Sequence, residues 1–338
     1  MEEDTLQSIQ KGLTETRENL AHWIEATPES KKQVQCAEDG TCIDERLDVI
    51  DQELEKIQDG TFGVCEVCHE EIDEVLLKMD YTSFVCLGHF TEAELRQLES
   101  ELELSQVVQR GLLPQQAPNI PGLAIAAFSR PAQIVSGDYF DFVQFKDGGH
   151  GIVMADVSGH GVSAGMLMSS LQTAFHTLVP VSDSPLDVLE RINHLYAHNI
   201  NVTAFVTVFF GKLSPDVRTF TYGSAGHNSA YLYRPATGEE VLLHPTGPAI
   251  GLMEGFHVRS EQVALNPGDT LVLYTDGVTE AMNPAHEQFG LDRLADSIRQ
   301  NNGLSPEQLI QRILLAVNTF TGGTPLVDDV TLVAARVG

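Results

Sequence analysis

The chain has 338 residues, of which 48 are acidic and 20 are basic, so its formal net charge is −28. Because protein affinity for nucleic-acid phosphates comes mostly from basic surfaces, this charge argues against direct nucleic-acid binding. The chain has no apolar run of about 18 residues and no signal-peptide pattern, so we expect a cytoplasmic protein without a membrane contact.

Two amphipathic helices are the first predicted elements. Apolar residues recur at heptad-like spacing over 6–24 and again over 47–57, which is typical of helices that bury one face. The helix breakers at 27–30 and 39–41 separate them, and Asp44 is a candidate cap for the second helix. We therefore expect a short helical hairpin.

All five cysteines lie before residue 90, and this odd, clustered set suits a metal site in a reducing compartment better than disulfides. Cys36 and Cys42 lack a second pair at ligand spacing and are expected to be free thiols. The others belong to two pairs with a two-residue spacer, separated by 17 residues: Cys65, Cys68, Cys86 and His89. Three thiolates and one imidazole close a tetrahedral site, so one structural Zn²⁺ is predicted. His69 adjoins Cys68 too closely for good ligand geometry and is expected at the surface.

The stretch 51–68, which ends on the first cysteine pair, resembles the DksA/TraR-type zinc finger, and the resemblance covers about 44–92. In that family a helical hairpin carries the finger, and some members enter the secondary channel of RNA polymerase. This chain has His89 where a fourth cysteine is usual, and its hairpin is short. The resemblance implies a zinc-finger module over 1–92 and, as a further partner, RNA polymerase.

Residues 93–113 predict a helical linker. Thr91 followed by Glu94 forms a capping box at its start, and Pro114 ends it. One face of the helix is apolar, with leucines at three positions: Leu95, Leu98 and Leu102. The helix would either pair with its twin in a homodimer or pack on the following domain.

The remaining residues, 114–338, are predicted to form one domain in which strands come in runs and helices in pairs. Strands are predicted at 123–128, 151–155, 203–213, 220–222, 230–233, 271–275 and 330–333, with the third to fifth of these forming a meander, and Asp138 lies on a further predicted strand. Helices are predicted at 162–178, 185–198, 291–300 and 306–320. This order suits an α+β layered sandwich better than a repeating parallel β-α-β fold.

Four aspartates lie at the ends of predicted strands: Asp138, Asp156, Asp276 and Asp328. For any one of them alone, ordinary turn chemistry is the simpler interpretation. Their recurrence predicts a shared metal site instead. Oxygen-only sites suit Mg²⁺ or Mn²⁺, and two such ions can activate a water and clamp a phosphoryl group.

These motifs resemble the SpoIIE/RsbU-type branch of the metal-dependent protein phosphatases, which have the phosphatase 2C fold. Five segments carry the resemblance in family order: SGDYFD (136–141), ADVSGHGVSA (155–164), SAGHN (224–228), PGDTLVLYTDGVTE (267–280) and DDVTL (328–332). The resemblance implies an α-β-β-α sandwich that hydrolyses phosphoserine or phosphothreonine on a protein, usually an antagonist of an anti-sigma factor. It also favours the homodimer as the role of the linker helix.

By the same resemblance, Asp156 and the carbonyl of Val157 bridge two catalytic ions, Mn²⁺ or Mg²⁺. The other ligands are divided between the ions: Asp138 and Asp276 on one, Asp276 and Asp328 on the other. These ions are expected to supply the attacking water, so that no phosphoenzyme is needed.

Five further residues are candidates for secondary roles. Asp141 and Asp329 would support the ligands or hold a third ion. His160 would act as general acid or stabilise a turn, since the acid of the eukaryotic relatives lies two residues earlier. His227 is expected to hold a hairpin through backbone bonds, and Arg130 is the nearest cation for a phosphate.

Two other classes of function remain open. A catalytically silent phosphatase-fold scaffold is one, although a scaffold does not need four carboxylates at strand ends. A transcription regulator whose finger engages RNA polymerase is the other. Replacement of Asp156 separates the enzyme from the scaffold, and co-purification with polymerase core tests the regulator.

Overall fold

The computed structural model describes residues 6, 9–10, 12–14, 17, 43–72, 77, 85–89, 91–159, 161–199, 205–252, 257–324 and 326–338. The chain divides into a smaller unit, Met1–Glu101 with Asn201–Thr203, and a larger unit, Leu102–Ile200 with Ala204–Gly338. The predictions made for Cys36, Cys42 and His160 fall outside the described residues. No described helix is long and apolar enough to cross a membrane.

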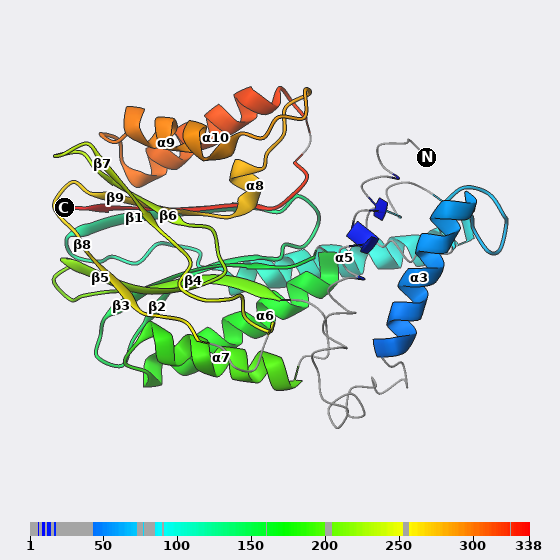
Figure 1. Ribbon diagram of the computed structural model, residues 1–338, viewed down its shortest axis with the longest axis horizontal. Coiled ribbons are helices and arrows are strands. Elements are labelled where there is room, and N and C mark those ends of the chain that lie inside the picture. Colours follow the sequence, from blue (N-terminus) through cyan, green and yellow to red (C-terminus); the bar gives the residue numbers. More distant parts are fainter. Residues whose placement is uncertain are drawn as a thin grey trace. The chain divides into compact units, whose positions relative to one another are not determined.

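The strands of the larger unit form two five-stranded antiparallel sheets (Figure 1). The first sheet has the order β1 (Leu123–Arg130), β10 (Val330–Val337), β9 (Thr270–Tyr274), β6 (Ala230–Arg234) and β7 (Glu239–Leu243). The second has the order β2 (Asp138–Gln144), β3 (His150–Val157), β4 (Val206–Leu213), β5 (Thr219–Ala225) and β8 (Glu261–Ala264).

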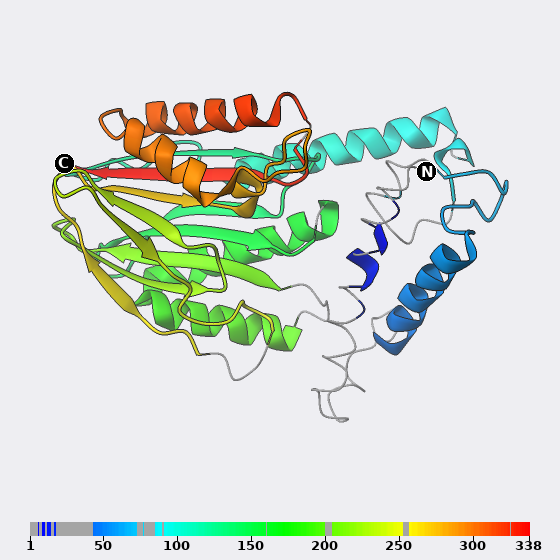
Figure 2. The same cartoon turned by 45° about the horizontal axis from the view of Figure 1, so that its top comes forward.

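Helices cover the outer face of each sheet (Figure 2). The second sheet carries α6 (Gly161–Leu178), the short η2 (Val179–Val181) and α7 (Pro185–Asn199), while the first carries α9 (Gly290–Gln300) and α10 (Pro306–Thr321). One apolar core lies between the two sheets, and one lies under each helical pair. The predicted α-β-β-α sandwich is therefore confirmed.

The alternation of side chains along β2 decides which residues face which core. Tyr139 and Val143 pack under α6 and α7, whereas Phe140 packs between the sheets. Asp138 is two residues before Phe140 and so shares the inter-sheet face. This alternation places the first predicted ligand inside the sandwich rather than under the helices.

Most predicted helices and strands are confirmed to within a few residues. The predicted meander is wrong in the position of its third strand. β6 pairs with β7 and β9 in the first sheet, not with β5. Gly226 has a φ of 68°, and a Cβ there would lie 2.9 Å from the backbone nitrogen of Ala249. This glycine turn lets the chain leave the second sheet and cross to the first. The strands β7 and β8 were not predicted, because both are short and carry exposed acids.

The smaller unit contains α3 (Ile43–Asp59), the short η1 (Leu87–His89) and the first half of α5 (Glu92–Leu112), which continues into the larger unit. Ile9 and Leu13 pack with Ile50 in one cluster, so the two predicted N-terminal helices meet through their apolar faces. α3 begins at Ile43, so Asp44 lies in its first turn and is not its cap.

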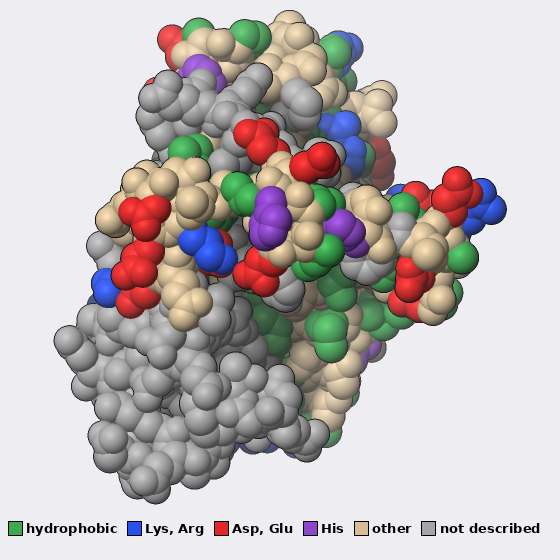
Figure 3. Space-filling view, turned by 90° about the vertical axis from the view of Figure 1, so that its right-hand side faces the viewer, with side chains coloured by type: hydrophobic (Ala, Val, Ile, Leu, Met, Phe, Trp, Pro, Cys, Tyr) green, Lys and Arg blue, Asp and Glu red, His purple; other side chains and the backbone are tan. Residues whose placement is uncertain are grey.

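The start of α5 is as predicted. The backbone nitrogen of Thr91 donates to Glu94 at 2.7 Å, and the backbone nitrogen of Glu94 donates to the Thr91 hydroxyl at 3.3 Å, which completes the capping box. The helix ends at Leu112, just before Pro114. Asp and Glu side chains are spread over the face seen in Figure 3, with fewer Lys and Arg among them.

Candidate metal centres

Asp138 and Asp156 lie opposite each other on adjacent strands. Asp138 opens β2, Asp156 is the penultimate residue of β3, and the two are direct partners in the antiparallel register. Directly paired residues project to the same face of a sheet, so both side chains point between the two sheets. Asp138 is 2% exposed.

Gly137 allows the backbone to approach closely beside this pair. A Cβ at Gly137 would lie 2.9 Å from the carbonyl oxygen of Val157, and the nitrogen of Val157 donates to the Gly137 carbonyl at 3.3 Å. The segment that delivers Asp138 therefore lies against the predicted carbonyl ligand, and any side chain at 137 would displace one of them.

Asp276 and Asp328 come from the first sheet. Asp276 opens the short helix α8 (Asp276–Thr279), which follows β9, and Asp328 lies two residues before the neighbouring strand β10. Thr275 connects them to the second sheet, because its hydroxyl donates to Oδ2 of Asp138 at 2.8 Å and accepts from the nitrogen of Thr331 at 3.0 Å. The four predicted aspartates are thus gathered where the strand ends of the two sheets meet.

Burial and mutual repulsion raise the pKa of these carboxyls. Burial first, and then the charges of Asp276, Asp328 and Asp329, raise the pKa of Asp156 to about 8. Burial also raises the pKa of Asp328 to about 6 and is the main cause of the raised pKa of Asp138 and Asp276. Divalent cations offset this repulsion, so the donor set fits Mg²⁺ or Mn²⁺.

The carboxylates are spaced more widely than ligands of one bound ion. Among the described residues, no three carboxylates bring one oxygen each within 4.8 Å of one another. Three of these side chains would therefore move toward one another on sharing an ion, whose oxygen ligands lie about 2.0–2.6 Å from it.

Asp329 organises the segment that leads to Asp138. Its carboxylate accepts hydrogen bonds from the nitrogens of Ala132 and Gly137 at 2.7 and 2.8 Å and from the Ser136 hydroxyl at 2.7 Å. Both oxygens are occupied by these donors. The structure is consistent with the supporting role expected for it.

Asp141 does not join the four aspartates. Its position three residues after Asp138 places it on the opposite face of β2, where the side chain is 4% exposed. Its carboxylate accepts from the Tyr139 hydroxyl at 2.6 Å and lies 2.7 Å from Nε2 of His176 on α6. Strand alternation turns it toward the helices, so it lies on the other face of β2 from the ligand Asp138 that it was expected to support.

His227 contacts the backbone of Tyr274, as expected, and also a side chain. Its Nδ1 lies 2.8 Å from the hydroxyl of Thr207, which is the register partner of Asp156 on β4. Burial lowers the pKa of His227 to about 4, so the imidazole is neutral near pH 7. It ties the turn after β5 to the strand beside the aspartates.

Two contacts beside the site were missed from the sequence. Thr275 is one, and its place directly before Asp276 was the available signal. The other is Gln109 of α5, whose amide donates to the Ser136 carbonyl at 2.7 Å and accepts from the Ser136 nitrogen at 2.9 Å. No local pattern in the linker helix marks this glutamine.

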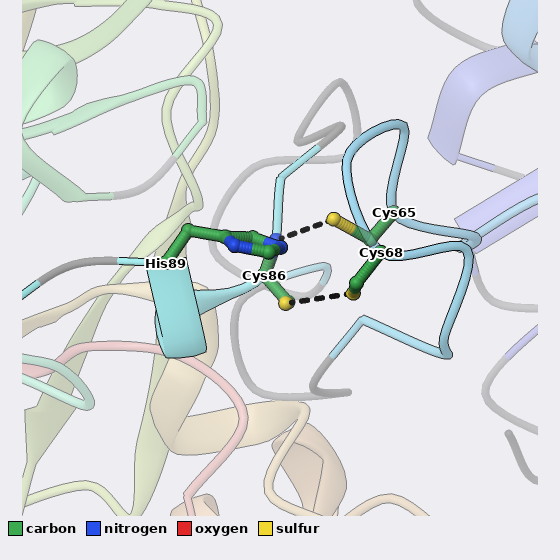
Figure 4. Close-up of side chains that lie close together, drawn as sticks. All are labelled: Cys65, Cys68, Cys86 and His89. Carbon is green, nitrogen blue, oxygen red and sulfur yellow. Dashed lines mark hydrogen bonds between the residues drawn. The ribbon is translucent and has the colours of Figure 1, made fainter.

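A second cluster lies in the smaller unit and contains the four predicted zinc ligands: Cys65, Cys68, Cys86 and His89. One ligand atom from each lies within 4.8 Å of the others, and Figure 4 shows the sulfurs and the imidazole turned toward one another. The sulfurs of Cys68 and Cys86 are 3.5 Å apart, close to the separation that tetrahedral Zn–S bonds impose. His69 is outside the cluster and exposed, with a φ of 58°.

Backbone donors prepare this cluster for a cation. Burial opposes ionisation of Cys65, but backbone N–H groups of Cys68, Cys86 and Val67 outweigh it and lower the pKa of Cys65 to about 5. A thiolate is the form that binds Zn²⁺. The residues present therefore fit a structural zinc.

The two-sheet sandwich with acidic strand ends defines a phosphatase of the phosphatase 2C class. Its fold is that of the SiaA-PP2C domain of Pseudomonas aeruginosa, with a TM-score of 0.65 and 21% identity over 73% of this chain and 100% of that one. The chain belongs to the SpoIIE family, because the family model described as "Stage II sporulation protein E (SpoIIE)" matches residues 146–338.

Two relatives extend this assignment. "Phosphoserine phosphatase RsbU" of Bacillus subtilis (strain 168) is 31% identical over 277 residues, which cover 78% of this chain and 80% of RsbU. The structure of the RsbU and RsbW domains of Rv1364c from Mycobacterium tuberculosis has a TM-score of 0.54 and 30% identity. That match covers 65% of this chain and 61% of Rv1364c as solved.

Proposed function

We propose that this phosphatase hydrolyses phosphoserine or phosphothreonine on a protein, and that its substrate is the antagonist of an anti-sigma factor. The observation that carries the proposal is the meeting of Asp138, Asp156, Asp276 and Asp328 at the ends of the two sheets. The name of RsbU supports phosphoserine as the substrate group.

In this proposal two Mn²⁺ or Mg²⁺ ions bind, and Asp156 and the Val157 carbonyl would be ligands of both. The other ligands are Asp138 and Asp276 on one ion, and Asp276 and Asp328 on the other. Such ions supply an activated water and neutralise charge on the phosphoryl group.

The protein's own groups keep the ligands in place. Thr275 donates to Asp138 and thereby fixes one of its oxygens. Asp329 holds the segment 132–137 through three hydrogen bonds. Both contacts reduce the freedom of Asp138 before substrate binds, which is the preorganisation that electrostatic catalysis needs.

Hydrolysis of p-nitrophenyl phosphate and of a phosphoserine peptide, with and without Mn²⁺, tests the proposal. Asp156→Asn should lower metal-dependent turnover by about a thousandfold or more, because one bridging ligand loses its charge. Asp292→Asn, at an exposed position in the first turn of α9, is the matched control and should retain activity. Inactivity of the wild-type chain toward both substrates would instead support the silent scaffold.

The smaller unit is proposed to regulate this activity. We infer one structural Zn²⁺ on Cys65, Cys68, Cys86 and His89, in a DksA/TraR-type module over 1–92 that is followed by a linker over 93–113 and a phosphatase domain over 114–338. The approach of the four ligand atoms supports the zinc. RNA polymerase contact follows from the family resemblance alone, and co-purification with polymerase core tests it.

We also propose a homodimer through α5. Three apolar side chains at adjacent helical positions, Leu104, Val107 and Val108, are 62%, 63% and 57% exposed. Their spacing forms one stripe along the helix. Gln109 on the other side is buried against Ser136, so α5 already uses one face for packing and leaves this stripe for a second copy.

A further inference from the structure

A cavity of about 490 Å³ lies beside the aspartate cluster, on the outer side of the first sheet. Its walls are the end of β1, the end of α10 and the segment that leads to Asp328. The lining includes Arg130, Ala132, Asn318, Thr321, Thr324 and Leu326. Figure 1 shows that the end of α10, the start of β10 and α8 lie at the same end of the sandwich. The cavity is therefore next to the proposed catalytic residues.

Arg130 faces this cavity from the last position of β1. Along that strand, Ala126 and Phe128 pack against the α9 and α10 side of the sheet, and alternation places Arg130 on the same side. The side chains of Asp138 and Asp156 lie on the inner side, between the sheets. The guanidinium thus lines a compartment separate from the four carboxylates.

The Arg130 side chain has no hydrogen bond or ion pair with any residue that the structure describes, and the same is true of the Asn318 amide. Arg130 does not cap α10 by hydrogen bonding. At the end of that helix, the hydroxyls of Thr321 and Thr324 donate to the carbonyls of Asn318 and Thr321 at 3.2 and 2.8 Å. An exposed arginine and a free amide therefore remain to bind something else.

Two backbone segments that line the cavity also contact the segment that carries Asp328 and Asp329. Arg130 is the register partner of Val330, two residues after Asp328. Ala132 lines the cavity and donates its backbone nitrogen to Asp329 at 2.7 Å. Between Leu326 and Asp328, the side chain of Val327 is 80% exposed. The cavity thus adjoins the backbone segments that carry Asp328 and Asp329.

Charge indicates what the cavity binds. Residues 111–338 carry 21 acids and 11 bases, a net charge of −10, and Arg130 is the one base among the residues that line the cavity. Guanidinium groups bind carboxylates through two parallel hydrogen bonds. In the proposed phosphatase the divalent ions take the phosphoryl group, which leaves Arg130 for another anion of the substrate.

We propose that this cavity binds an aspartate or glutamate side chain of the phosphoprotein, close in sequence to the phosphoserine, through Arg130 and Asn318. Leu326 and Val327 provide apolar contact beside it. The proposal rests on the phosphatase function proposed above and adds the property that the enzyme selects acidic sequences around the phosphorylated residue.

Two phosphoserine peptides test the proposal: one with aspartates at the positions flanking the phosphoserine, and one with asparagines there. The wild-type chain with Mn²⁺ should prefer the aspartate peptide by about tenfold in kcat/KM, mainly through KM, as expected for one charge-assisted pair. Arg130→Ala should abolish this preference and leave hydrolysis of p-nitrophenyl phosphate within about twofold. Arg130→Lys should keep part of the preference, because it retains the charge but not the planar fork.

Arg312→Ala is the matched control for loss of positive charge, since Arg312 is exposed on α10 but does not line the cavity; it should keep the preference. Equal kcat/KM for the two peptides in the wild-type chain, with p-nitrophenyl phosphate still hydrolysed, overturns the acidic subsite alone. An equal loss on all three substrates in Arg130→Ala also overturns it and assigns the arginine to the phosphoryl group. Wild-type inactivity on all three substrates overturns the phosphatase function, and the subsite with it.

Discussion

At the scale of single residues, Thr275 joins the two sheets at the aspartate cluster. Its hydroxyl donates to Asp138 of the second sheet and accepts from the nitrogen of Thr331 in the first. The side chain is fully buried, so loss of the hydroxyl would remove one of the two threonine partners of Asp138 and the acceptor of the Thr331 nitrogen.

Thr275→Val should therefore cost about 1–3 kcal/mol in the free energy of unfolding. Metal-dependent kcat/KM should fall by roughly ten- to a hundredfold, because Asp138 is no longer held. Urea unfolding and p-nitrophenyl phosphate hydrolysis measure the two effects. Thr275→Ser keeps the hydroxyl and should lose little of either. Similar behaviour of the two variants would show that the hydroxyl does not position Asp138.

The sequence predicts that the four aspartates form one site, but it does not predict the residues that hold them. Recurrence at strand ends is visible in a sequence, since apolar runs and carboxylates both leave a pattern. The triple hydrogen bonding of Asp329 and the pairing of Gln109 with Ser136 join positions far apart in the chain, and no local pattern encodes them. Asp141 shares the motif of Asp138, whereas strand alternation turns the two side chains to opposite faces of β2.

At the scale of elements, α5 has two different faces in its second half. One is fixed to the larger unit by Gln106 and Gln109, which bond to the backbone of Ile134 and Ser136. The other exposes Leu104, Val107 and Val108. An exposed apolar stripe on a helix is stabilised when it pairs with a second stripe.

Val107→Glu should convert the proposed dimer to a monomer, because a charge at the centre of an apolar helix pair is costly to bury. Light scattering at several protein concentrations measures the change. Leu315→Glu alters a side chain that is 55% exposed on α10 and should leave the dimer intact. A wild-type chain that is monomeric throughout the concentration range would contradict the assignment of this stripe.

The Cys/His cluster is an element that a metal ion would complete. Cys65→Ser should lose one equivalent of zinc by elemental analysis and loosen the smaller unit toward proteolysis, since structural zinc supplies folding free energy. His69→Asn should keep the zinc, because His69 lies outside the cluster and Asn tolerates its left-handed backbone. Retention of a full equivalent in Cys65→Ser would exclude the four-ligand site.

The helices with strong apolar periodicity were predicted well. The pairing of strands into sheets was predicted less well. α6, α7, α9 and α10 were all predicted from their apolar spacing. The crossing of β6 to the other sheet was not, because a glycine turn such as that at Gly226 is equally compatible with a hairpin. Local propensity thus determined which segments are strands, and long-range pairing determined to which sheet each belongs.

At the scale of the whole molecule, the sandwich brings like charges together and therefore couples stability to pH and to metal. A carboxyl with a raised pKa in the folded state binds its proton more tightly there than in the unfolded chain. Its stabilising contribution is complete below the unfolded pKa and is lost as the pH rises through the folded pKa. For Asp328 and Asp156 the folded values are about 6 and about 8.

Metal-free protein should therefore lose stability from about pH 4, the unfolded pKa of Asp, up to about pH 8, measured as Tm in excess EDTA. Asp156→Asn should flatten the upper half of this decline and raise Tm near pH 8, although it abolishes activity. Mn²⁺ should restore the Tm of the wild-type chain at the alkaline end, because an ion that binds only the folded state stabilises it, and should restore the variant less. Asp292→Asn should follow the wild-type chain throughout.

The contribution of His227 to stability changes with pH in the opposite direction to that of the aspartates. Its pKa is lowered to about 4, so its contribution is present above the unfolded value of about 6.5 and is lost as the pH falls below it. Between about pH 4 and pH 6.5 the imidazole and the carboxyls therefore oppose each other, and above about pH 6.5 the decline that Mn²⁺ reverses belongs to the carboxyls alone. A wild-type Tm in EDTA that is flat up to about pH 8.5 and indifferent to Mn²⁺ would mean that the four aspartates do not form one electrostatic cluster.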